Sequence, residues 1–116
     1  MKEGNVVILF MPQADGAVKN RPAVILREMP PFRDVLVCGI STQLRQALND
    51  FDDIISPSDP DFELSGLKDE SVIRLGFLVV VPRNKIIGAI GSIAPERHKR
   101  LLQRLSSYLM QSVTQP

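Results

Sequence analysis

The chain has 116 residues, of which 44% are hydrophobic and 23% charged, with a single cysteine and a formal net charge of +1. Length and composition predict one globular domain spanning residues 1–116, and the lone cysteine excludes an internal disulfide or a thiolate metal cluster. No apolar run approaches the roughly 20 residues of a membrane span, and the first residues show no secretion signal, so we expect a cytoplasmic protein without a membrane partner.

The first 40 residues predict three strands. Asn5–Phe10 is rich in β-branched residues, which favour strands, and residues 11–20 predict a loop because they hold a proline and an Asp-Gly turn signal. Pro22 has no N–H to donate, so it belongs at the first residue of a strand or on a sheet edge. The apolar run Ala23–Leu26 predicts a strand buried on both faces, and a third strand is predicted over residues 35–40.

The remaining chain predicts shorter elements and one helix. We expect a helical turn at 44–50, an edge strand at 51–55, apolar strands at 71–75 and 77–81 and a last strand at 86–93. Gly76, between two apolar runs, suits a bulge or sharp bend. Pro95 suits a first helical turn, and an apolar stripe at helical period follows it, formed by Leu101, Leu102, Leu105, Tyr108 and Leu109. Six or seven short strands and one amphipathic helix predict a mainly β fold, a small, strongly bent barrel with an appended C-terminal helix.

Charge is divided unevenly along the sequence. Residues 45–70 hold eight acidic and two basic residues, whereas residues 71–116 hold seven basic residues and one acidic residue. Such a division is typical either of a polyanion-binding face beside an acidic lobe or of two solvated surfaces.

Five segments, in this order, resemble one protein family. They are the glycine-led first strand at 4–7, Asp15-Gly16 with Arg21-Pro22-Ala23-Val24-Ile25-Leu26, Ile40-Ser41-Thr42-Gln43, Gly66-Leu67-Lys68 with Ser71-Val72-Ile73-Arg74-Leu75, and Ile90-Gly91-Ser92-Ile93 with the closing helix. Over residues 4–110 the chain resembles the PemK/MazF-like toxins of bacterial toxin–antitoxin systems. The resemblance implies an SH3-like barrel, a homodimer, and a metal-independent endoribonuclease that cleaves single-stranded RNA without a cofactor. It also implies a cognate antitoxin whose tail lies across the RNA groove.

The resemblance assigns catalytic roles to Arg21, Ser41 and Arg74. An arginine stays protonated and can grip phosphate oxygens bidentately, and a serine hydroxyl can donate to phosphate. The residues expected to contact RNA are Asp15, Lys19, Asn20, Thr42 and Gln43. From the residues alone, either arginine could instead form an ion pair, Arg74 with Glu28 or Glu63, and Ser41 could cap the next turn.

One position departs from the family pattern. Some members carry an acidic residue two positions after the strand arginine, where this chain has Gly76. The general base is therefore unassigned, with Asp15 and Glu28 as possible substitutes. An alternative function is a catalytically impaired module that binds RNA or an antitoxin peptide without cleavage. The related gyrase-poisoning toxins rank last, because residues 112–116 show no aromatic ending.

Overall fold

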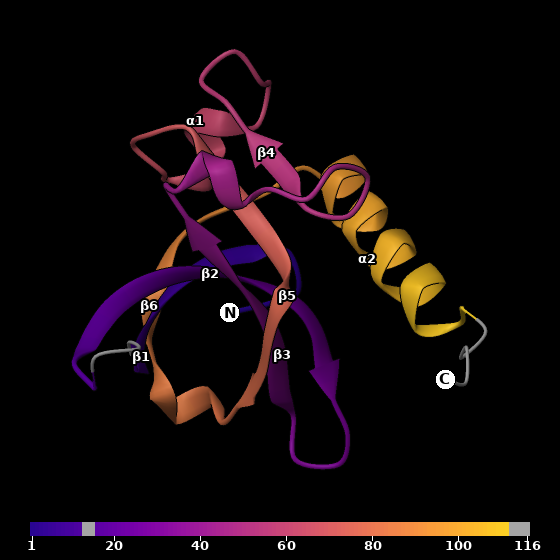
Figure 1. Cartoon of the computed structure of the whole chain (residues 1–116). Helices are drawn as coiled ribbons and strands as arrows, with labels where there is room; N and C mark the ends of the chain where they lie inside the picture. The colour runs from indigo at the N-terminus through magenta and orange to yellow at the C-terminus, as the bar shows by residue number, and fades with distance from the viewer. Residues whose placement is uncertain (13–15, 112–116) are drawn as a thin grey trace.

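The computed structural model describes residues 1–12 and 16–111. Six antiparallel strands form one sheet, in the order β4-β5-β3-β2-β1-β6 (Figure 1). The strands are β1 Asn5–Pro12, β2 Val18–Met29, β3 Asp34–Ser41, β4 Asp53–Ile55, β5 Ser71–Val81 and β6 Ile86–Ser92. The helices are α1 Phe62–Ser65 and α2 Pro95–Leu109, with 3-10 turns η1 Leu44–Gln46 and η2 Arg83–Lys85. The predicted mainly β fold with a C-terminal helix is confirmed.

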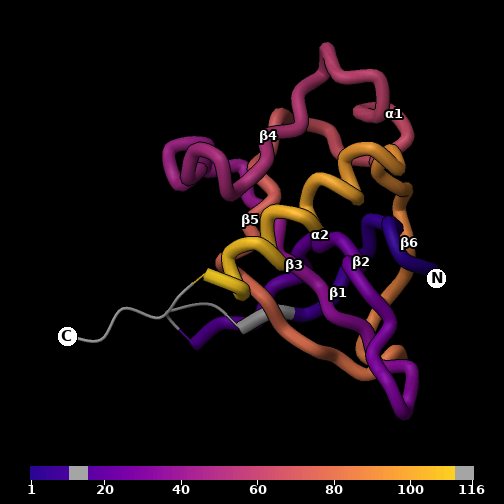
Figure 2. Tube along the Cα trace, turned by 90° about the vertical axis from the view of Figure 1, so that its right-hand side faces the viewer, coloured from indigo at the N-terminus to yellow at the C-terminus, as the bar shows by residue number. Residues whose placement is uncertain are grey.

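The sheet curls, and each of its faces buries a separate core. The inner core lies inside the curl, because strands from both halves of the sheet supply it: Val7, Leu9, Ala23, Ile25, Val35, Val37 and Ile86. The outer core includes Val24, Leu26, Cys38, Ile73 and Leu75, together with Leu101 and Leu105 of α2. The helix runs across the outside of the sheet (Figure 2). Alternation along β2 thus explains why Ala23–Leu26 is buried on both faces, as predicted.

Two local predictions need correction, and the one for Pro22 is confirmed only in part. Residues 18–20 are not loop but the start of β2, where Lys19 and Asn20 pair with β1. Pro22 is not the first residue of its strand, but it lies where β2 is paired on one side only: it pairs with Ile8, and pairing with β3 begins at the next residue. The two strands predicted around Gly76 form one, β5, whose register with β3 shifts between Cys38 and Gly39. Pro22 is tolerated within β2 because residues 18–22 have no partner strand on the β3 side.

Helix α2 is amphipathic over part of its length. Pro95 begins it, as predicted, and Leu101 and Leu105 are buried. The end of the predicted stripe is exposed instead: Tyr108 and Leu109 retain 56% and 69% of their accessible surface. They line an apolar groove of about 630 Å³ between α2 and β5, together with Leu48 and Leu78. No helix in the described part of the chain is long and apolar enough to cross a membrane.

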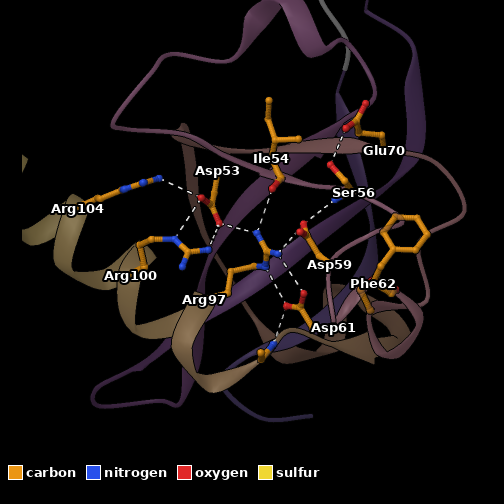
Figure 3. A network of polar contacts seen from close by, with 12 residues as sticks. Asp53, Ile54, Ser56, Asp59, Asp61, Phe62, Glu70, Arg97, Arg100 and Arg104 are labelled. Atoms are coloured by element: carbon orange, nitrogen blue, oxygen red, sulfur yellow. Dashed lines mark hydrogen bonds and ion pairs between the residues drawn. The ribbon is translucent and has the colours of Figure 1, made fainter.

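Arginines of the basic C-terminal stretch form ion pairs with aspartates of the acidic stretch. The Arg97 guanidinium, on α2, donates to the carboxylates of Asp53, Asp59 and Asp61 and to the carbonyl of Ile54 (Figure 3). Arg100 and Arg104 also donate to Asp53. Much of the basic stretch therefore binds the acidic stretch, and neither proposed reading of the charge division, polyanion face or solvated surfaces, describes these residues.

Two glycines set the approach of α1 to β6. A Cβ at Gly91 would overlap backbone atoms of Leu64 and Ser65, and a Cβ at Gly66 would overlap the carbonyl of Ile90. Gly66 also has φ +76°, a left-handed conformation that favours glycine and ends α1. The two chain segments consequently pack backbone against backbone and hold the segment after α1 against the sheet.

Candidate functional site

Strand register places the three predicted catalytic residues on one face of the sheet. Ala23 pairs with Gly39, and Gly39 pairs with Arg74. Arg21 lies two residues before Ala23, and Ser41 lies two residues after Gly39. Because side chains alternate along a strand, all three face the side that carries the inner core.

A pocket of about 380 Å³ lies at this end of the sheet. It collects Arg21 and Ser41 with three of the residues expected to bind RNA. Its lining residues are Lys19, Asn20, Arg21, Pro22, Ile40, Ser41, Thr42, Leu67, Lys68, Asp69 and Ser71. Two strands that follow one another in sequence thus build one wall, and the segment after α1 builds the other.

The Ser41 hydroxyl accepts one local hydrogen bond and can still donate another. Its Oγ accepts a hydrogen bond of 3.0 Å from the backbone N–H of Gln43, so the capping contact considered from sequence is present. A hydroxyl has one proton to donate as well as two lone pairs. The contact with Gln43 uses a lone pair and leaves the proton available to a ligand.

Arg74 is on the same face but does not line the pocket. It pairs with Gly39, over which the Phe77 ring packs, since a Cβ at Gly39 would lie 3.2 Å from Phe77 Cδ1. The bulge after Arg74 brings Gly76 into the groove beside α2. The Arg74 Nε is buried and has no hydrogen-bond partner among the described residues. A buried N–H without an acceptor is unfavourable.

Glu28, one of the two proposed general bases, does not line this pocket. Glu28 lies near the opposite end of β2, where Arg83 donates to it at 2.6 Å and Arg33 lies 3.3 Å away. The hydrogen bond from Arg83 lowers the pKa of Glu28 against the effect of burial, and Arg33 lowers it further. Glu28 is therefore neither a partner of Arg74 nor placed to act as a base. Asp15 lies outside the described residues.

Sequence reasoning missed the second wall of the pocket. Lys68 and Asp69 line it, while Gln43 does not. The Gly66-Leu67-Lys68 segment belongs to the resemblance, but no local signal indicates that it faces Arg21, 47 residues earlier in the chain. In the described residues, no group of three or more His, Cys, Asp or Glu side chains is arranged to hold a metal ion.

The comparisons with known proteins agree with this architecture. Residues 2–109 match the family model described as PemK-like, MazF-like toxin of type II toxin-antitoxin system. Among solved structures, the chain is similar to the Mycobacterium tuberculosis toxin MazF-mt6, with a TM-score of 0.66 and 20% sequence identity over 94% of this chain and 99% of that one. No curated protein sequence matches. The family match covers almost the whole chain, and the chain therefore belongs to the PemK-like, MazF-like toxins of type II toxin–antitoxin systems.

Proposed function

We propose that this toxin is a metal-independent endoribonuclease that cleaves single-stranded RNA at the pocket of Arg21 and Ser41. The observation that carries the proposal is the composition of this pocket. Three cationic side chains, Lys19, Arg21 and Lys68, line it with hydroxyl and amide groups. Cations and neutral donors gathered around one pocket suit the phosphodiester backbone of RNA.

The reaction requires one bond to form and one to break at phosphorus. The 2′-oxygen attacks the adjacent phosphate, its proton passes to a base, and the P–O5′ bond breaks as the leaving oxygen takes a proton. The products are a 2′,3′-cyclic phosphate and a 5′-hydroxyl. Arg21 and Arg74 would stabilise the additional negative charge on the phosphate oxygens, and the Ser41 hydroxyl would donate to one of them.

A second set of residues would hold the RNA. Lys19, Asn20 and Thr42 line the pocket beside Arg21. Gln43 follows directly and could contact a base edge beyond the pocket, and Asp15 belongs to the same proposed contact set. The proton acceptor is proposed to be Asp69, the acidic member of the described pocket lining.

The homodimer and the antitoxin belong to the same proposal. The groove between α2 and β5 exposes Leu48, Leu78, Tyr108 and Leu109, which supports a contact with a second copy of the chain. A cognate antitoxin segment would neutralise the toxin by covering the pocket that binds RNA.

The first test is incubation of purified protein with a long single-stranded RNA in the presence of EDTA. We expect discrete cuts that end in 2′,3′-cyclic phosphate. Arg21→Ala and Arg74→Ala should each lower the cleavage rate by about 10²- to 10³-fold, because each removes a contact to developing charge. Arg27→Ala is the matched control, since Arg27 is an exposed arginine at the other end of β2 and lines no part of the pocket.

Two results would contradict the nuclease. Intact RNA with folded wild-type protein would reject it, and equal cleavage by the Arg27, Arg21 and Arg74 variants would reject the site. The alternative, a module that binds RNA or an antitoxin peptide without cutting, is favoured by the missing acid at Gly76. It predicts retarded, intact RNA under the same conditions.

A further inference from the structure

A chain of hydrogen bonds connects helix α2 to the second wall of the pocket. Arg97 Nη2 donates to Asp59 Oδ2 at 3.0 Å, and the same oxygen accepts from the backbone N–H of Ser56 at 2.8 Å. Ser56 Oγ then donates to Glu70 Oε2 at 2.5 Å (Figure 3). Glu70 lies between Asp69 and Ser71, which both line the pocket.

The segment held by this chain has little regular structure of its own. Leu67, Lys68, Asp69 and Ser71 line the pocket, and we call residues 67–71 the pocket wall. Residues 67–70 lie between the end of α1 and the start of β5 and belong to neither. At its first residue the wall is tied back to α1, where the Leu67 N–H donates to Ser65 Oγ. Lys68 and Asp69 are exposed. Within the wall, Ser71 Oγ donates to the Asp69 carbonyl at 2.8 Å. The position of Lys68 and Asp69 therefore depends on this bond and on the anchors at the two ends of the wall.

The inner end of the hydrogen-bond chain is rigid. Arg97 makes five hydrogen bonds, which equals the number of N–H donors of a guanidinium. Its side chain retains 7% of its accessible surface. Ser56 is therefore held by Asp59, which Arg97 fixes in place, and Glu70 is connected to this network by its one contact with Ser56 Oγ.

We propose that Glu70 is a positioning residue of the RNA site: through Ser56 and Asp59 it fixes the pocket wall so that Lys68 and Asp69 face Arg21 and Ser41. This inference rests on the proposed function for its RNA readout. The Ser56–Glu70 contact is exposed, so its loss should have little effect on global stability. Local opening of a segment, by contrast, needs far less free energy than global unfolding.

The experiment compares Glu70→Ala with Glu70→Gln and with Glu63→Ala. The glutamine retains an oxygen that can accept from Ser56 Oγ. Glu63 is an exposed acid on α1, so Glu63→Ala makes the same change in charge without touching the wall. The first readout is hydrogen–deuterium exchange of the amides in residues 66–72. The second is kcat and KM on single-stranded RNA, together with the Kd for a 2′-O-methyl RNA that cannot be cleaved.

We expect faster amide exchange at 66–72 and an increase of about five- to tenfold in both KM and Kd for Glu70→Ala, with an unchanged melting temperature. Glu70→Gln and Glu63→Ala should resemble the wild type. Unchanged exchange in Glu70→Ala would overturn the inference, as would faster exchange with unchanged RNA binding. If the wild type binds RNA without cutting it, the proposed reaction fails, while exchange and the Kd still decide the role of Glu70.

Discussion

Two arginine side chains in this toxin have opposite surroundings. Every N–H of Arg97 has an acceptor, and although burial lowers its pKa, the carboxylates of Asp61 and Asp53 outweigh that effect and raise it. Arg74 Nε is buried without a partner among the described residues. Leaving such a donor unpaired costs about 1–3 kcal/mol. Arg97 is therefore structural, while the role of Arg74 at the proposed RNA site stays a prediction.

The proton acceptor is also tested at the residue level. Asp69→Asn keeps the size of the side chain and removes its ability to accept a proton. We expect kcat for RNA cleavage to fall by about 10²-fold, the usual contribution of a positioned general base, with the melting temperature unchanged because Asp69 is exposed. Glu63→Gln is the control. A kcat within twofold of the wild type, about 0.4 kcal/mol, would remove Asp69 from the mechanism.

At the level of elements, α1 and β6 meet where glycine is required. The groups that a Cβ at Gly91 would meet are backbone atoms of α1, which cannot rotate away as a side chain could. The same contact holds Gly66, where the pocket wall begins. The family segments around Gly66 and Gly91, far apart in sequence, are thus two sides of one close contact.

Gly91→Ala should therefore destabilise the fold. We expect the free energy of unfolding, measured by urea denaturation, to fall by about 2–3 kcal/mol, because the new methyl group forces two backbone segments apart. Gly88→Ala on the same strand is the matched control, since a Cβ there would have no atom within 4 Å. Its effect should stay within about 0.5 kcal/mol. Equal effects of the two substitutions would contradict the close contact.

At the level of the whole molecule, the ion pairs of α2 join the helix to β4 and to the acidic segment that follows it. Asp61 accepts from Arg97 and also from the backbone N–H of Ala94, immediately before α2. The hydrogen bond from Arg97 lowers the pKa of Asp61 below its ordinary value of 3.8, against the effect of burial. A carboxyl whose pKa is lower in the folded state stabilises the fold above its unfolded pKa and loses that contribution as pH falls.

Acid should consequently weaken the fold through Asp61. We expect the free energy of unfolding of the wild type to fall as pH decreases below about 4, toward the lowered pKa of the folded state. Asp61→Asn should cost about 2–3 kcal/mol at pH 7 and show a smaller decrease in acid. Urea denaturation between pH 3 and 7 measures both, with the exposed Asp50→Asn as control. A variant with the same pH dependence as the wild type would contradict this role of Asp61.

Local patterns predict the positions of most strands and of the C-terminal helix, but not helix α1 or the continuity of β5 through Gly76. β-branched runs predicted the strands, and Pro95 with its leucine stripe predicted the helix, because these signals depend on neighbours within a few residues. The ordered motifs also indicated the family, and with it Arg21, Ser41 and Arg74. Local turn signals wrongly predict a loop at Lys19 and Asn20, because β1 extends far enough to pair with both residues.

Contacts between distant parts of the chain determine which of the predicted site residues lie together. Only the strand register brings Arg21 to Ser41, and only the bulge in β5 moves Gly76 away from their pocket. The pocket wall and the binding of the basic helix to the acidic segment are likewise contacts between distant parts of the chain. Local sequence therefore specifies most of the strands, the C-terminal helix and the family, whereas strand register and packing, which no short segment encodes, bring particular side chains into one pocket.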